Sequence, residues 1–195
     1  MKVGLIGLGH IGEYMSRRML KSGIEVWGYR RNYKKANELF ERGDVSGITT
    51  TIENLVKVIK RNNRPGIFQM AVPPESVEEI INELIRYCGD GDIIIDHGNS
   101  NHLDSRNRAE QLAKLGIQYI DCGISGNVYD LEDGYCLMIG GETTAVATCS
   151  RIFSALASDI DSCQRTDLYK KITSPYNGWL HCGGPGTGHF AIMFM

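Results

Sequence analysis

The residues whose spacing points most directly to chemistry are three glycines near the start of the chain. Gly7-Leu8-Gly9-His10-Ile11-Gly12 has the pattern G-x-G-x-x-G, between a short apolar run and a stretch of helical period. In such a strand-turn-helix unit the first glycine permits the tight turn, the second lets the backbone approach a pyrophosphate, and the third lets helix and strand pack closely. Amide groups of the first helical turn then point at the phosphates. The motif predicts a dinucleotide site, with an ordinary glycine-rich turn as the alternative.

Two arginines follow the next apolar run, in the sequence Gly28-Tyr29-Arg30-Arg31-Asn32. NAD sites place a carboxylate at this point to accept hydrogen bonds from the ribose hydroxyls, whereas NADP sites use arginine for the 2′-phosphate. This stretch holds no carboxylate, and its two guanidinium groups offer planar donors to a phosphate. We therefore expect NADP rather than NAD, bound by Arg30 and Arg31. The alternative is that both arginines are solvated residues at a helix start.

These residues need a scaffold that brings strand ends together, and the rest of the chain predicts one. Apolar, β-branched runs alternate with amphipathic stretches, which is typical of a parallel sheet with helices on both faces. The predicted helices include His10–Lys21, one from near His102 to Gly116, and two introduced by capping boxes at Thr50/Glu53 and Ser76/Glu79. The predicted strands are Lys2–Ile6, Glu25–Tyr29, Gly66–Val72, Asp92–Asp96 and Ile117–Asp121.

The last third of the chain has weaker signals. Cys136–Ile139 predicts a further strand and Glu142–Leu156 a helix, but after Asp159 the glycine-rich sequence predicts a loop that leads into the apolar end Phe190–Met195. We expect one dinucleotide-binding domain over residues 1–178. Residues 179–195 are expected to be the truncated start of a C-terminal segment.

Composition limits the possible partners. The chain has 195 residues and a net charge of −2, so it lacks the basic field of a protein that binds nucleic acid or an anionic membrane. The apolar start breaks at Gly4 and Gly7, too early for a signal peptide or a membrane span, and we expect a cytoplasmic protein. The six cysteines form no C-x-x-C pair, which argues against a metal site and a disulfide framework.

Five blocks of the sequence resemble, in order, motifs of the decarboxylating 6-phosphogluconate dehydrogenases. The blocks are Gly4–Gly9, Ala71–Pro73, Asp96–Ser100, Asp121–Gly126 and Gly186–Phe190, of which the third and fifth are the most specific. The resemblance covers nearly the whole chain. It implies a Rossmann-type, doubly wound parallel sheet that lacks the C-terminal helical domain of the family, and with it most of the dimer interface.

The resemblance also implies roles for individual residues. Val72 would border the cofactor, Asn99 would lie beside nicotinamide and substrate, and His189 would orient a substrate hydroxyl, which makes Asn99 and His189 the catalytic candidates. The implied substrate-binding residues are Asn99, Ser125, Gly126, Asn127 and His189. Each has a plainer alternative: Asn99 with Ser100 as a helix cap, residues 125–127 as a simple turn, and His189 as a partner of loop carbonyls.

Two positions depart from the family pattern. Asn127 stands where the family has a second glycine, which adds a side chain where backbone would approach the substrate. Ile192 stands where the family has a lysine thought to act as general base. An alkyl group cannot exchange a proton, and general acid-base help is typically worth about 10² to 10⁴ in rate.

Three functions follow from these observations. By resemblance the chain is an oxidoreductase of the pentose phosphate pathway, which passes hydride from C3 of 6-phosphogluconate to NADP before the β-keto acid loses carbon dioxide and gives ribulose 5-phosphate. Ile192 and the short C-terminal segment favour instead a non-catalytic NADP-binding fragment or remnant. A third candidate, a β-hydroxyacid dehydrogenase relative, also needs a lysine and a substrate domain. By family name, the chain would have the first function. We expect its actual behaviour to be the second, NADP binding without catalysis.

Overall fold

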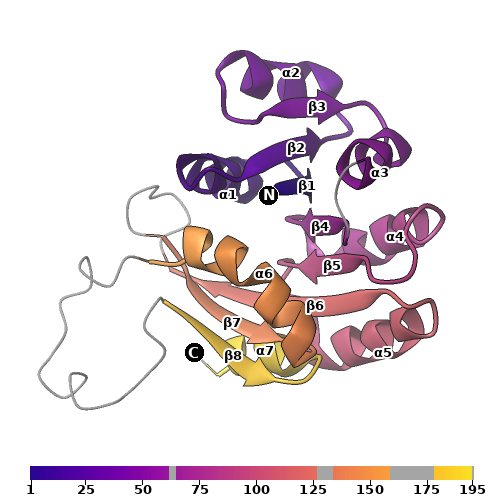
Figure 1. Ribbon diagram of the computed structural model, residues 1–195. Helices are drawn as coiled ribbons and strands as arrows, with labels where there is room; N and C mark the ends of the chain where they lie inside the picture. Colours follow the sequence, from indigo (N-terminus) through magenta and orange to yellow (C-terminus); the bar gives the residue numbers. More distant parts are fainter. Residues whose placement is uncertain (62–64, 127–133, 159–177, 195) are drawn as a thin grey trace, which may run out of the picture.

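The computed structural model describes residues 1–61, 65–126, 134–158 and 178–194, which form one sheet flanked by helices (Figure 1). In chain order the elements are β1 (Lys2–Ile6), α1 (His10–Lys21), β2 (Glu25–Tyr29), α2 (Tyr33–Glu41), β3 (Gly47–Thr49), α3 (Ile52–Lys60), β4 (Ile67–Met70), α4 (Pro74–Leu84), β5 (Ile93–Asp96), α5 (His102–Ala113), β6 (Gln118–Ser125), β7 (Cys136–Gly140), α6 (Thr143–Leu156), β8 (Trp179–Gly183) and α7 (Thr187–Ile192).

The eight strands lie in the order β3-β2-β1-β4-β5-β6-β7-β8, as Figure 1 shows from top to bottom. The strands from β3 to β6 are parallel to their neighbours, β7 is antiparallel to β6, and β8 is parallel to β7. The order 3-2-1-4-5-6 is that of a doubly wound dinucleotide-binding fold, in which ligands bind outside the carboxyl ends of the strands. The predicted fold class is confirmed.

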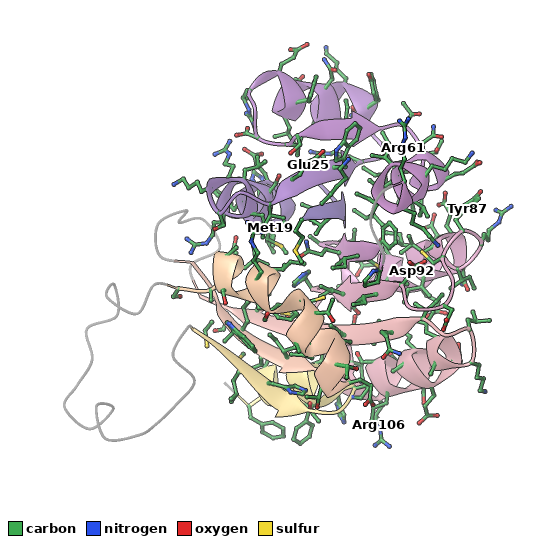
Figure 2. The ribbon with its side chains drawn as sticks, in the orientation of Figure 1. Met19, Glu25, Arg61, Tyr87, Asp92 and Arg106 are labelled. Atoms are coloured by element: carbon green, nitrogen blue, oxygen red, sulfur yellow. The ribbon has the colours of Figure 1, made fainter. Side chains whose placement is uncertain are left out.

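Two hydrophobic cores hold helices on the two faces of the sheet. One core joins the sheet to α1, α2 and α6, and the other joins it to α3, α4 and α5. Met19, labelled in Figure 2, projects from α1 into the first core and is fully buried. The strands therefore contribute apolar side chains to both faces, which explains why their sequences are nearly continuous apolar runs.

Two of the predicted helix starts need correction, whereas α1 and α5 start at His10 and His102 as predicted. Helix α3 is capped by Thr51, whose side chain accepts a hydrogen bond from the Asn54 amide, so the prediction of Thr50 is wrong by one residue. Helix α4 starts at Pro74 and Ser76 lies inside its first turn, so no capping box forms there. Proline is favoured in the first turn because its missing N–H would have no helical partner. The expected left-handed residue after α5 is present, at Gly116 with φ +72°.

The expectation of a loop after Asp159 is wrong for the residues described there. Residues 179–183 pair with β7 as β8, and residues 187–192 form α7. Helix α7 packs closely on the sheet because glycines leave room: a Cβ atom on Gly188 would lie 2.5 Å from the Met138 carbonyl oxygen and 2.6 Å from that of Asp121. This segment joins the sheet, while the division into residues 1–178 and 179–195 stays a prediction.

None of the helices in the described part of the chain is long and apolar enough to cross a membrane.

Candidate cofactor groove and substrate-side residues

The three glycines of the turn between β1 and α1 differ in what an added Cβ atom would meet. Gly7 has φ +95°, and a Cβ there would collide with the Ala71 carbonyl oxygen. A Cβ on Gly12 would collide with the Gly7 carbonyl oxygen, whereas a Cβ on Gly9 would meet nothing within 4 Å. Gly9 is also the N-cap of α1 and has no side chain to cap the helix amides. The open space at the helix start therefore fits a pyrophosphate held by backbone amides.

A groove of about 320 Å³ opens beside this turn. It lies where the carboxyl ends of β1, β2 and β4 meet the start of α4. Its lining residues are Ile6, Gly7, Leu8, Gly9, Tyr29, Arg30, Arg31, Asn32, Ala71, Val72, Pro73 and Ile80. Six predicted cofactor residues are thus brought together: Gly7, Leu8, Gly9, Arg30, Arg31 and Val72. His10 and Ile11 are exposed in the first turn of α1, outside this lining, and Gly12 is buried behind it.

The two arginines of the groove have different surroundings. Arg30 is half-buried, and its Nη1 donates a hydrogen bond to the Leu8 carbonyl oxygen at 2.6 Å. Arg31 is exposed, and its Nη2 lies 3.8 Å from Oε2 of Glu79 on α4. Asn32 caps α2 by accepting a hydrogen bond from the Lys35 amide. Arg30 is therefore tied to the glycine turn, while Arg31 is held only by an exposed ion pair.

A buried carboxylate organises the loop that carries Asn99. Asp96, at the end of β5, accepts hydrogen bonds from the Gly98 amide at 2.8 Å, the Ser100 hydroxyl at 2.8 Å and the Tyr119 hydroxyl at 2.7 Å. Burial and the neighbouring Asp96 carboxylate raise the pKa of Tyr119 well above its ordinary value, so its hydroxyl stays a donor. The loop is thereby fixed, with Asn99 in the left-handed region at φ +50°.

Asn99 connects this loop to β6. Its Oδ1 accepts a hydrogen bond from the Ile124 amide at 3.1 Å. Pairing between β5 and β6 ends at Asp96 and Asp121, so the Asn99 side chain continues the contact where the strand partner stops. Ser125 is half-buried at the end of β6, and Gly126 is exposed with φ +129°. The structure therefore brings Asn99 close to Ser125, while Asn127 lies outside the described residues.

A second buried carboxylate, Asp121 on β6, holds helix α7. Its Oδ1 accepts a hydrogen bond from the Gly186 amide at 2.6 Å and its Oδ2 from the His189 amide at 2.7 Å. A carboxylate at a helix start accepts amides that have no helical partner. The backbone of His189 is thus fixed against the strand that leads to Ser125.

His189 itself is fully buried. Its Nδ1 lies 2.8 Å from the Ser105 hydroxyl oxygen on α5. Burial lowers the pKa of His189, and the nearby Asp96 and Asp121 carboxylates only partly oppose this. The ring is therefore placed as a neutral group behind the surface, and its contact with a substrate hydroxyl stays a prediction.

Ile192, on α7, faces strand β6. A Cβ atom on Gly123 would lie 2.9 Å from Cβ of Ile192 and 3.0 Å from the Gly188 carbonyl oxygen. The alkyl side chain is thus in contact with β6, two residues before Ser125.

The motifs match a known family along most of the chain. A family model described as the NAD binding domain of 6-phosphogluconate dehydrogenase matches residues 2–166. The chain belongs to this family. The match explains why the glycine turn, the Asn99 loop and the end of β6 occur in this order.

A curated relative agrees with the family assignment, and solved structures share the fold. The decarboxylating 6-phosphogluconate dehydrogenase of Chlamydia muridarum is 34% identical over 191 residues, which are 96% of this chain and 37% of the relative. The 6-phosphogluconate dehydrogenase of Plasmodium falciparum, whose structures include complexes with NADP+ and with 6-phosphogluconate, superposes with a TM-score of 0.81 at 23% identity. That match covers 99% of this chain and 39% of the Plasmodium chain.

The third candidate family shares the fold. The 3-hydroxyisobutyrate dehydrogenase of Mycobacterium tuberculosis superposes with a TM-score of 0.77 at 18% identity, over 97% of this chain and 57% of the other. The chain thus spans well under two thirds of the length of the relatives that it matches.

Several residues of the site were not predicted from the sequence. Tyr29, Pro73 and Ile80 line the groove, and Asp96 and Asp121 hold the loop and the helix of the substrate side. Both aspartates end apolar runs inside motifs that the resemblance identified. An acidic residue there was a usable signal, because a buried carboxylate needs hydrogen-bond donors.

Proposed function

We propose that this chain binds NADP in the groove beside the β1–α1 turn, in preference to NAD. The observation that carries the proposal is the open space at Gly9, at the start of a twelve-residue helix, next to a groove that ends in two arginines. The amides of the first turn of α1 would hold the pyrophosphate. Arg31 would bind the 2′-phosphate, because Arg30 is already tied to the Leu8 carbonyl.

On the substrate side, the proposal is a phosphorylated sugar acid, 6-phosphogluconate by family. Bound NADP supplies a hydride acceptor. Asn99, Ser125, Gly126 and, from the sequence, Asn127 would bind and orient the sugar acid. His189 is proposed as a positioning residue, because its ring is buried against Ser105. A cytoplasmic location and the two segments 1–178 and 179–195 belong to the same proposal.

The second candidate function, NADP binding without turnover, is favoured by Ile192. Oxidation of a substrate alcohol releases a proton from the hydroxyl, and a basic side chain must take it. The alkyl side chain of Ile192 packs on Gly123 and cannot accept that proton. We therefore expect residues 1–195 alone to bind NADP and to catalyse the family reaction at most very slowly, by a factor of about 10² to 10⁴ below a chain with a base.

A combined binding and turnover experiment tests this proposal. The purified chain is titrated with reduced NADP while cofactor fluorescence is followed, and is then mixed with NADP and 6-phosphogluconate while reduced cofactor is followed by absorbance. We expect saturable binding and no turnover above background. Ready turnover would contradict the non-catalytic proposal, and absence of binding would contradict the cofactor proposal. An Ile192→Lys variant is the matched test of the missing base.

A further inference from the structure

At the end of the groove that carries Arg31, an acidic side chain lies beside the basic one. Arg31 and Glu79 are each 70% exposed and lie 3.8 Å apart across the groove mouth, Arg31 after β2 and Glu79 on α4. Glu79 directly precedes Ile80, which lines the groove. Within the described part of the chain, Arg31 forms no ion pair other than the one with Glu79.

The surroundings of Tyr29 place a second carboxylate, that of Glu83, nearby. Tyr29 lines the groove and is half-buried. Burial is the main reason that its pKa is raised; Glu83 and Glu79 raise it further, whereas Arg31 lowers it. The phenol, the guanidinium and two carboxylates therefore share one neighbourhood, and a phosphate that enters it meets carboxylates as well as Arg31.

We propose that Glu79 is a specificity-determining residue, which pairs with Arg31 in the free protein and competes there with the 2′-phosphate of the cofactor. This inference rests on the proposed NADP site and names its counter-ion. Binding of a phosphate requires Arg31 to leave Glu79, so the carboxylate weakens NADP binding. A cofactor without the 2′-phosphate has no such competitor, and NAD binding is unaffected by the pair.

The size of the effect follows from exposure. An ion pair between exposed side chains contributes about 0.2 to 1 kcal/mol, so its removal should tighten binding of a 2′-phosphate by about 1.5- to 5-fold. Because the groups are exposed, the effect should shrink when the salt concentration rises from about 0.1 M to about 1 M.

The test uses two probes that differ only in the 2′-phosphate, 2′,5′-ADP and 5′-AMP, with dissociation constants measured by calorimetry. We expect Glu79→Gln to tighten 2′,5′-ADP binding by about 1.5- to 5-fold at low salt and to leave 5′-AMP unchanged. In an Arg31→Gln background, the same substitution should give no gain. Glu78→Gln is the matched control, because the neighbouring Glu78 makes its ion pair with Arg108, at 3.1 Å.

The outcomes separate this inference from the proposed function. An unchanged affinity of Glu79→Gln for 2′,5′-ADP would overturn it, as would an equal gain for 5′-AMP, an equal gain in Glu78→Gln, or a gain that persists without Arg31. Failure of the wild-type chain to bind either probe would instead overturn the proposed cofactor site itself.

Discussion

At the residue scale, the glycines of the β1–α1 turn can be separated by experiment. Gly9→Ala adds a Cβ that meets no protein atom within 4 Å, at a backbone φ of −83° that alanine tolerates. We expect its thermal stability to equal that of the wild type, while NADP affinity falls by about tenfold or more, because the methyl group occupies the path of the pyrophosphate.

Gly12→Ala is the contrasting variant. Its Cβ would collide with the Gly7 carbonyl oxygen, so helix and strand must move apart. We expect a loss of about 1 to 3 kcal/mol in the free energy of unfolding by urea. Gly9→Ala protein that binds NADP like the wild type would contradict the assignment of the turn.

His97 is a buried residue whose titration should lower stability in mild acid. It is buried at the end of β5, with its Nε2 3.1 Å from Oε1 of Gln69, whose amide nitrogen donates to the Met19 sulfur at 3.2 Å. This orientation of Gln69 makes His97 Nε2 the donor in a neutral ring. Burial lowers the pKa of His97 to about 4, with His189 adding to the shift and Asp96 opposing it.

A lowered folded-state pKa has a definite sign. Between the ordinary histidine pKa of 6.5 and about 4, the unfolded chain binds a proton that the folded chain does not, so stability falls as the pH falls through this window. We expect this residue to reduce the free energy of unfolding by about 2 kcal/mol between pH 7 and pH 5. Urea unfolding of wild type and His97→Gln at both pH values checks this; an equal acid loss in the two proteins would contradict it.

Site residues that lie close together in the sequence could be predicted, whereas those brought together from distant parts of the chain could not. The glycine turn and the arginines were found because their spacing is local and each has one physical purpose. Tyr29 and Ile80 were missed because they lie on β2 and α4, which are far apart in the sequence and line one groove only in the folded protein. Asp121 was missed as an anchor because its donor amides, Gly186 and His189, lie 65 and 68 residues away.

At the element scale, most strands and long helices were predicted from periodicity, but β3, β8 and α7 were not. The sequence from Gly178 to Gly188 is dominated by glycine, which locally favours loops. Pairing with β7 makes residues 179–183 a strand, and close packing on β6 and β7 makes residues 187–192 a helix. Tertiary contacts thus override local propensity in this segment.

Asp121→Asn tests how α7 is held. The substitution preserves size but leaves one acceptor oxygen for two amides and places a donor against an N–H group. We expect a loss of about 1 to 3 kcal/mol, expressed locally as faster amide hydrogen exchange in α7 than in β1 and β2.

The control for this variant is Asp104→Asn, at an exposed position in the first turn of α5. It should leave the exchange rates of α7 unchanged. Equal acceleration throughout the sheet in Asp121→Asn would show that the carboxylate supports the whole fold rather than this helix.

At the scale of the whole molecule, the two parts of the site meet behind Val72. Val72 lines the groove, and its carbonyl oxygen lies 3.0 Å from where a Cβ of Gly98 would stand, in the loop that carries Asn99. The cofactor end and the substrate end are therefore neighbours along the carboxyl edge of the sheet, as the doubly wound fold requires.

Beyond that edge, apolar side chains are exposed near α7. Phe190, Met193 and Phe194 are 46%, 60% and 76% exposed. Such a patch favours association or aggregation of the isolated chain, so cofactor titrations are best made at low protein concentration.

The most direct test of the proposed NADP site is the ratio of the dissociation constants of this chain for NADP and NAD, measured by equilibrium titration at low salt. Amides at the start of α1 together with Arg31 should bind NADP about tenfold or more tightly than NAD. Equal or tighter binding of NAD, or no binding of either cofactor, would contradict it.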